Sequence, residues 1–134
     1  VIRGLHYQMP PYAQSKLVSV FQGKVLDIVI DIRKGSPNFG KHLAIELSGI
    51  NQKQLYIPRG FAHGYSCLSE TAMLSYKVDN YYNKDSEASI AFDDLQLGID
   101  WKIPQELQKL SPKDFQNPSF EAAHHFDYNQ PFYD

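Results

Sequence analysis

The sequence predicts an all-β domain, built either as a sandwich or as a barrel. Short stretches of alternating apolar and polar residues recur along the chain, and no long helical stretch interrupts them. Turn-forming residues separate these stretches at 22–23, 34–37, 38–40, 48–49 and 58–60. Short strands at close intervals are typical of both architectures. A chain of 134 residues is expected to form a single domain, residues 1–134.

The first segment, residues 1–18, has the sequence VIRGLHYQMPPYAQSKLV and the pattern of a buried strand that carries charges. Arg3, His6 and Lys16 lie among its apolar residues. Burying an unpaired charge is costly, so charged side chains are rarely enclosed without a partner. These residues are therefore either surface groups at strand ends or the lining of a pocket.

Residues 24–33, KVLDIVIDIR, show the clearest strand alternation. One face carries Leu26, Ile28, Ile30 and Ile32, and the other carries Val25, Asp27, Val29 and Asp31. Further strands are predicted at 42–48, 54–58, 71–78 and 88–92. Asp27 interrupts an otherwise apolar strand, and Tyr76 lies in the middle of another.

Three other segments are expected to contain a turn, a short helix or a loop. Residues 57–66, IPRGFAHGYS, are expected to contain a turn bracketed by Gly60 and Gly64, which can aim His63 into the mouth of a barrel. Residues 103–110 are expected to form a short helix or turn. The tail after Pro118 is polar and aromatic, and we expect it to pack as a loop or to lie partly disordered.

The composition argues against several classes of partner and compartment. Lys and Arg number 13 and Asp and Glu number 15, which gives a net charge of −2 and no field for nucleic acid or an anionic membrane. No apolar run approaches the ~18 residues of a membrane span, and no signal peptide opens the chain. Cys67 is the single cysteine, so no intrachain disulfide can form, as expected for a soluble cytoplasmic protein.

Five side chains would form an acid–base set if the strands close into a barrel. They are His6, Lys16, Asp27, His63 and Tyr76, to which Arg3 adds a further cation. Each of them taken alone is explained as a surface charge or as a hydrogen-bonded core residue. An enclosed set of such groups is costly unless it is used, so their convergence would indicate a functional site.

The sequence does not favour a metal site or a nucleophile. The H-x-H pair of many metal-binding β-barrels is missing, because Tyr7 and Gln8 follow His6. His124 and His125 are adjacent, and adjacent strand residues point to opposite faces. No G-x-S-x-G, GxGxxG or P-loop motif occurs. We therefore expect no metal and no other cofactor.

Five blocks of the chain resemble the dTDP-4-dehydrorhamnose 3,5-epimerase family. In order, they are VIRGLHYQ, QSKLV, GKVLDIVIDIRKGSPNFG, QLYIPRGFAHGYSCLS and LGIDW, and the resemblance extends from Val1 to about Pro118. It implies a cupin-type β-barrel of jelly-roll form that works without a metal, usually as a homodimer. It also implies epimerisation at C3 and C5 of dTDP-4-dehydro-6-deoxy-D-glucose to dTDP-4-dehydro-L-rhamnose, the precursor of L-rhamnose in bacteria.

The resemblance assigns roles to particular residues, motif by motif. The implied catalytic residues are His6 as base, Asp114 as its dyad partner, Tyr76 as acid and Lys16 as the cation that stabilises an enolate. The substrate-binding set comprises Arg3, His63, Tyr82 and Asp27. Asp27 is included as a residue that orients His63 or Lys16, with a purely structural role as the alternative.

Other readings remain open at this point. Family members carry an N-terminal region before the RGLH block, which residues 1–134 are expected to lack, either because they are part of a longer protein or because the protein is naturally truncated. Only in the second case would thymidine recognition and strand exchange in the dimer be in question. The alternatives are a C3-only epimerase of a related dTDP-4-keto-6-deoxyhexose, a non-catalytic nucleotide-sugar-binding module, and a metal-dependent cupin. The presence of His6, Tyr76 and Asp114 argues against a binding module, because a binder needs no acid–base pair.

Overall fold

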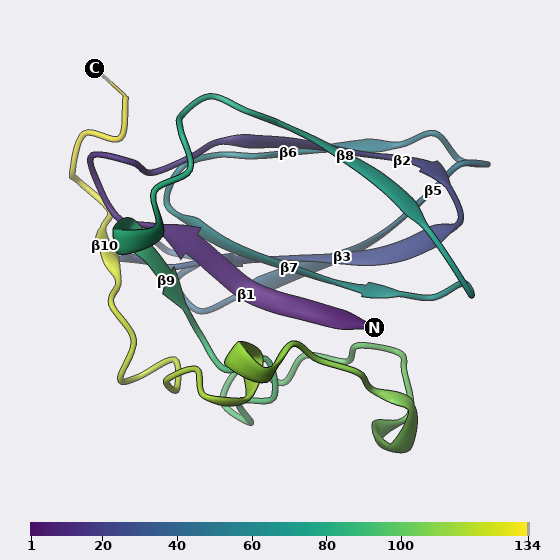
Figure 1. The fold of residues 1–134 in the computed structure, drawn as a ribbon. Coiled ribbons are helices and arrows are strands. Elements are labelled where there is room, and N and C mark those ends of the chain that lie inside the picture. Colours follow the sequence, from purple (N-terminus) through teal and green to yellow (C-terminus); the bar gives the residue numbers. More distant parts are fainter. Residues whose placement is uncertain (134) are drawn as a thin grey trace.

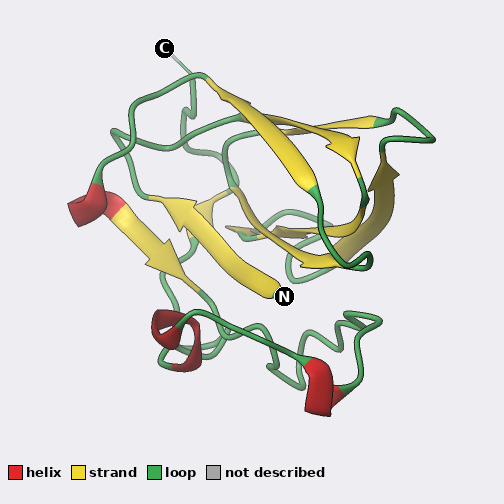
Figure 2. Ribbon diagram, turned by 45° about the vertical axis from the view of Figure 1, so that its right-hand side comes forward, coloured by secondary structure: helices red, strands yellow, loops and turns green. Residues whose placement is uncertain are grey.

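The structure, a computed structural model, describes residues 1–133 and is built almost entirely from β-strands and loops (Figures 1 and 2). The predicted all-β class is confirmed. An antiparallel five-stranded sheet has the order β5 (His42–Ser48), β3 (Lys24–Asp31), β7 (Phe61–Cys67), β1 (Ile2–Gln8) and β9 (Glu87–Ser89). A three-stranded sheet lies opposite it, with the order β6 (Gln54–Ile57), β2 (Lys16–Gln22) and β8 (Met73–Val78).

The remaining elements are short. Two-residue strands β4 (Arg33–Lys34) and β10 (Phe126–Asp127) pair in parallel. Three 3₁₀ turns are η1 (Lys84–Ser86), η2 (Gln105–Leu107) and η3 (Pro112–Phe115). Within residues 1–133, no helix has the length and apolar character needed to cross a membrane.

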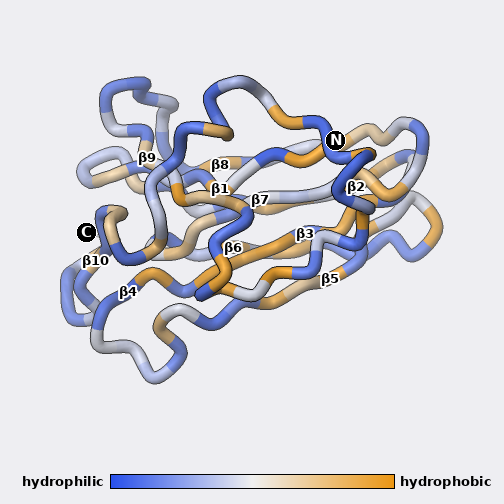
Figure 3. The backbone as a smooth tube through the Cα atoms, turned by 90° about the horizontal axis from the view of Figure 1, so that it is seen from below, coloured by the Kyte–Doolittle hydropathy of each residue, from blue (hydrophilic) through white to orange (hydrophobic). Residues whose placement is uncertain are grey.

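Strand β3 is buried on both faces, which explains why its sequence is almost continuously apolar (Figure 3). Toward the second sheet, its Val25 and Val29 pack with Val18, Val20, Leu47 and Ile57. The opposite face presents the four residues Leu26, Ile28, Ile30 and Ile32 to the irregular C-terminal half, which contributes Trp101, Phe120 and Phe126. The predicted alternation is thus correct, and each of its two faces supports a separate core.

The prediction of a turn at Gly60–Gly64 is wrong in its second half. Gly60 does turn the chain, with φ +99°, but residues 61–67 then form β7, which pairs with both β3 and β1 at the centre of the larger sheet. Gly64 has no positive φ and lies within the strand. Gly64 must lack a side chain because the backbone of β1 lies against it. A contact between strands that are distant in the sequence leaves no local signal in either segment.

Strands β1 and β7 approach each other closely at a pair of glycines. A Cβ on Gly64 would lie 2.7 Å from the carbonyl oxygen of Arg3, and one on Gly4 would lie 2.8 Å from the Cα of Gly64. The register of the two strands shifts between Arg3 and His6. The shift places His6 directly opposite His63.

The other predicted segments agree with the structure to different degrees. Strands are present at 24–31, 42–48, 54–57 and 73–78, close to the predicted ranges, whereas β9 ends at Ser89. Residues 103–110 contain the short turn η2, as expected. The tail after Pro118 is largely loop, but it buries Phe120, Ala123 and Phe126 and adds β10 beside β4, so it is more ordered than expected.

We predict that Gly64→Ala will lower the free energy of unfolding by about 3 kcal/mol, the upper end of the range for overpacking, because the new methyl group meets backbone atoms that cannot rotate away. Urea unfolding followed by circular dichroism measures the change. Gly98→Ala is the control, since Gly98 has φ +61° but nothing within 4 Å, and it should cost only about 1 kcal/mol of backbone strain. Equal losses in the two variants would show that the contact of β1 with β7 is not a constraint.

Candidate active site

A pocket of about 370 Å³ lies between the two sheets and brings together five of the eight expected site residues. Its lining consists of Arg3, His6, Lys16, His63, Gly64, Tyr65, Tyr76, Ser111 and Lys113. These residues come from β1, β2, β7 and β8, from the loop that leads into η3 and from η3 itself. Residues remote in the sequence thus converge because the strands wrap around one cavity.

His6 is paired with the carboxylate expected from the sequence. Its Nε2 lies 3.1 Å from Oδ1 of Asp114, a residue of η3 whose side chain is fully buried. Burial lowers the pKa of His6, and Asp114 and Glu87 oppose that effect while Lys113 and Lys16 add to it. Nδ1 of His6 has no hydrogen-bond partner among the described residues. With a proton on Nε2 facing Asp114, the imidazole is neutral, and its Nδ1 is a buried atom.

His63 forms a second histidine–carboxylate pair on the neighbouring strand. Its Nε2 lies 2.5 Å from Oδ1 of Asp27, which projects from β3 and is fully buried. Burial lowers the pKa of His63, and the hydrogen bond and charge of Asp27 oppose the shift. Asp27 does not line the pocket, so it orients His63 from behind rather than reaching the cavity.

Lys16 and Tyr76 complete the wall formed by the smaller sheet. Burial lowers the pKa of Lys16, although the charges of Asp27 and Glu87 oppose the change. Burial raises the pKa of Tyr76 well above its ordinary value, and nearby Tyr65 and Asp27 add to that rise. The ring of Tyr76 stands edge-on to His63 with the ring centres 5.9 Å apart. Tyr76 therefore retains its proton at neutral pH and can donate it.

Of the residues expected to bind the substrate, Arg3 lies in the pocket lining, whereas Tyr82 and Asp27 lie outside it. Arg3 lines the pocket, where its guanidinium donates to the carbonyl oxygen of Ile2 at 3.0 Å. Tyr82 does not line the pocket; its side chain is 67% exposed, and its hydroxyl donates to Glu87 at 2.8 Å. Asp27 also lies outside the lining, because it projects from β3 behind His63.

Tyr65, Ser111 and Lys113 also line the pocket, and they were not among the site residues expected from the sequence. Tyr65 shares one face of β7 with Phe61 and His63, at the two-residue spacing of a strand. That alternation could have identified Tyr65, but residues 60–64 were predicted to form a turn, so no strand face was assigned to them. Lys113 immediately precedes Asp114 and could have been suggested by that position.

No cluster of three or more His, Cys, Asp or Glu side chains suited to hold a metal occurs within residues 1–133. His6 and His63 are each held by one carboxylate instead. His125 contacts the carbonyl oxygen of Phe120 at 2.6 Å, far along the chain from the pocket residues.

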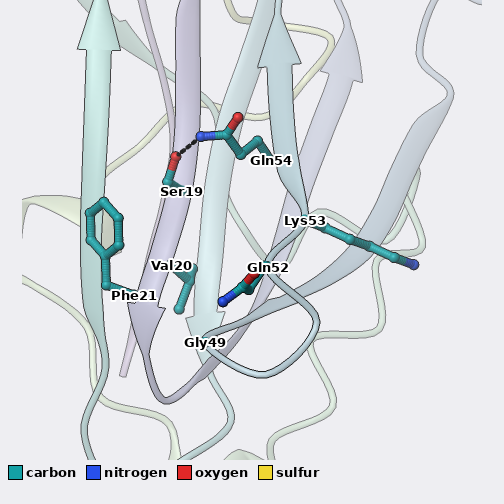
Figure 4. A pocket seen from close by; sticks show the side chains of 7 residues that line it. All are labelled: Ser19, Val20, Phe21, Gly49, Gln52, Lys53 and Gln54. Carbon is teal, nitrogen blue, oxygen red and sulfur yellow. Dashed lines mark hydrogen bonds between the residues drawn. The ribbon is translucent and has the colours of Figure 1, made fainter.

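A second pocket, of about 230 Å³, lies toward the other end of β2 (Figure 4). It is lined by Ser19, Val20, Phe21, Gly49, Gln52, Lys53 and Gln54. Gln54 donates to the Ser19 hydroxyl at 2.7 Å across it, and Lys53 points away from the other side chains. It contains no pair of titratable groups, so it offers none of the chemistry of the first pocket.

A family profile and the curated relatives found by comparison carry the same description, and they match most of the chain. A family profile described as dTDP-4-dehydrorhamnose 3,5-epimerase matches residues 1–122. The dTDP-4-dehydrorhamnose 3,5-epimerase of Shigella flexneri is 47% identical over 126 residues, which are 94% of this chain and 68% of the relative. The chain spans 68%, 67% and 61% of the length of three curated relatives, so it corresponds to about two thirds of them.

Two solved structures are similar to this one. The dTDP-4-dehydrorhamnose 3,5-epimerase of Elizabethkingia anophelis NUHP1 has a TM-score of 0.88 at 53% identity, covering 90% of this chain and 66% of that one. The dTDP-6-deoxy-D-glucose-3,5-epimerase of Legionella pneumophila Philadelphia 1, in complex with dTDP-4-keto-L-rhamnose, has a TM-score of 0.90 at 45% identity, covering 96% and 69%. The expected cupin-type barrel is confirmed by these likenesses.

We predict that the free energy of unfolding will fall as the pH is lowered from about 7 to 5, and that His63→Gln will flatten this dependence. The pKa of His63 is lowered in the folded chain, while an unfolded histidine titrates near ~6.5. The stability that neutral His63 contributes is therefore fully present above the unfolded pKa and is lost as pH falls through the folded one. Urea unfolding at a series of pH values measures the slope.

The exposed His42 on β5 provides the matched control, because His42→Gln should leave the slope unchanged. The same slope in wild type and His63→Gln would contradict the claim that folding shifts the titration of His63.

Proposed function

Since the chain belongs to the dTDP-4-dehydrorhamnose 3,5-epimerase family, we propose that it is an isomerase acting at C3 and C5 of dTDP-4-dehydro-6-deoxy-D-glucose. The product is dTDP-4-dehydro-L-rhamnose, a precursor for L-rhamnose and cell-surface polysaccharide. One observation carries the proposal: a histidine–carboxylate base and a tyrosine acid enter one pocket from facing sheets. The relative solved with dTDP-4-keto-L-rhamnose supports the choice of ligand.

The chemistry begins with proton abstraction by His6. The C4 carbonyl of the sugar makes the C–H bonds at C3 and C5 acidic, because the electron pair left behind is delocalised onto the carbonyl oxygen. The His6 side chain lines the pocket and is 22% exposed, so we assign it as the base that takes the proton. Asp114 fixes the ring through Nε2 and stabilises the imidazolium that forms.

The enolate needs a positive partner, which Lys16 is placed to supply, and His63 adds a polar group beside it. Both line the same cavity as His6. Lys16 offers an ammonium charge to the developing oxyanion, while His63, oriented by Asp27, offers a polar ring edge. These groups are held in position before the reaction, so little reorganisation is needed as the charge develops.

Epimerisation requires a proton to return on the other face of the sugar. His6 belongs to β1 of the larger sheet and Tyr76 to β8 of the smaller one, so a ring bound between them presents opposite faces to the two groups. Protonated Tyr76 donates to the enolate carbon from its side. His6 then releases its proton to solvent and Tyr76 regains one, and repetition at the second carbon, after the ring has changed its orientation, completes the reaction at C3 and C5.

The remaining site residues are assigned to substrate binding. Arg3 offers a planar fork of donors suited to the diphosphate. The exposed ring of Tyr82 is suited to stack on the base of the nucleotide. Asp27 contributes through His63 rather than by contact with the sugar.

We further propose a cytoplasmic homodimer. Cys67 is free, which is compatible with a reducing compartment. Strand β5 forms an edge of the larger sheet and exposes Leu43, and an exposed apolar edge strand is suited to cover by another chain. Sedimentation velocity should report the mass of two chains, and a sedimenting species of one chain would contradict the dimer.

The test of the function is incubation with dTDP-4-keto-6-deoxyglucose in D₂O with EDTA present, followed by NMR of the sugar. We expect deuterium at both C3 and C5. Label at C3 alone would identify a C3-only epimerase, and loss of activity with EDTA would identify a metal-dependent enzyme. Binding without any exchange would identify a nucleotide-sugar-binding module.

Two variants separate the base from the acid. General acid and base groups contribute about 10²–10⁴-fold each, so His6→Ala should lower turnover at least about 10²-fold and stop exchange. Tyr76→Phe should block completed epimerisation yet still allow some exchange by His6 on its own face. Equal loss of exchange and of epimerisation in the two variants would contradict the assignment of base and acid to opposite faces.

A further inference from the structure

The segment that follows β10 reaches the end of the smaller sheet at which β2 begins (Figure 1). The hydroxyl of its Tyr133 lies 2.5 Å from Oγ of Ser15, a residue 118 positions earlier in the chain. The same hydroxyl accepts a hydrogen bond from the backbone N–H of Arg59 at 2.9 Å. The match to the family profile ends at residue 122, so membership of the family assigns no role to these contacts.

Arg59, in the turn between β6 and β7, holds Tyr133 in place. Its guanidinium donates to the carbonyl oxygen of Phe132 at 2.7 Å and lies 4.8 Å from the centre of the Tyr133 ring. The same guanidinium is 3.3 Å from Oδ2 of Asp79, the first residue after β8. The Arg59 side chain is only 16% exposed, so these contacts are largely shielded from water. We call Ser15, Arg59, Asp79 and Tyr133 the C-terminal clasp.

Ser15 is the residue at which the contacts of the clasp meet. It is buried, and its backbone N–H donates to Oδ1 of Asp79 at 2.7 Å. Its carbonyl oxygen accepts from the backbone N–H of Asp79 at 3.4 Å, and its hydroxyl meets Tyr133. Ser15 immediately precedes Lys16, the first residue of β2. The clasp therefore fixes the backbone from which the Lys16 side chain leaves.

Lys16 needs such an anchor because it lies at the end of two strand ladders. Its backbone pairs with Ile57 of β6 and with Val78 of β8, and both are the last pairs of their ladders. Strand ends open more readily than strand centres. The charged and titratable side chains around Lys16 are Asp27 on β3, Glu87 on β9, His6 and Arg3 on β1, His63 on β7, Tyr76 on β8 and Lys113 on η3. A shift of the start of β2 would therefore change the position of the Lys16 ammonium within a crowded set of charges.

We propose that Tyr133 is a positioning residue: through Ser15 it fixes the start of β2 and so holds the Lys16 ammonium where the enolate oxygen develops its charge. The inference rests on the proposed function, since it assigns Tyr133 a role within that reaction. Tyr133 lies outside the pocket lining and touches no substrate in this account, so it acts through Lys16. A cation stabilises an oxyanion best when it is held in place before the charge develops, so loss of order at the start of β2 has a chemical consequence.

The test compares Tyr133→Phe with Tyr128→Phe. Tyr133→Phe removes the hydroxyl that meets Ser15 but keeps the ring over Arg59, so the packing of the clasp is preserved. Tyr128 belongs to the same C-terminal segment and is similarly exposed, 42% against 50% for Tyr133, but its ring lies over Arg33. Tyr128→Phe is therefore a matched control for loss of a tyrosine hydroxyl. Ser15→Ala removes the other partner of the same hydrogen bond.

The first readout does not depend on activity. The titration of Lys16 is followed by NMR of protein labelled with ¹³C at the lysine Cε, with Lys16→Arg used to assign the signal. Burial lowers the pKa of Lys16, so a looser and better hydrated side chain should titrate at higher pH in Tyr133→Phe and in Ser15→Ala. The double variant should shift no further than the larger single shift, because both changes break one hydrogen bond. Tyr128→Phe should leave the titration unchanged.

The second readout is kinetic. Tyr133→Phe should lower kcat by about tenfold, less than the ~10²–10³-fold cost of removing an oxyanion donor outright, and leave KM unchanged because the enolate charge is absent from the bound substrate. A Lys16 titration that is the same in Tyr133→Phe and Tyr128→Phe would overturn the inference, as would a rise in KM with kcat unaltered. A wild-type chain that exchanges no deuterium would refute the proposed function, while the NMR titration would still decide whether Tyr133 fixes Lys16.

Discussion

The close approach of β1 to β7 is the constraint on which the rest of the site depends. Gly4 and Gly64 leave no room for a side chain between the two strands, and the register shifts beside them. Because of this shift, His6 lies opposite His63 on neighbouring strands. A wider spacing would separate the two histidines, and a different register would turn one of them to the other face of the sheet.

The largely irregular segment that follows β9 supports the larger sheet. It covers the outer face of β3 with a large apolar core, and Ser66 on β7 donates to the carbonyl oxygen of Trp101 at 2.8 Å. The same segment carries η3, which delivers Asp114 to His6. The position of Asp114 is therefore secured by packing against the sheet, while Asp27 reaches His63 from within the sheet itself.

In the pocket, burial and the neighbouring carboxylates have opposite effects on the pKa of each histidine. Each histidine is pushed toward its neutral form by burial and drawn back toward protonation by a carboxylate. Three cationic side chains, Arg3, Lys16 and Lys113, line the same cavity, whereas its carboxylates lie behind the lining. An oxyanion that develops in the cavity would complete the balance, which is why the arrangement favours enolate chemistry over simple binding.

Local pattern in the sequence was sufficient for the β-class, for most strand positions and for the residue types of the site. Alternation is imposed by the two-residue period of a strand, so it is visible in 24–33 without knowledge of any neighbour. The resemblance of the RGLH and SPKD motifs to a family then suggested His6 with Asp114. Only the tertiary structure decided that 61–67 is a strand, that Tyr82 lies outside the pocket lining, and that Tyr65 and Glu87 belong to the site or its surroundings. Each of these depends on which strands lie side by side, because a glycine that permits close packing and a carboxylate that faces a distant imidazole leave no periodic signal in their own segments.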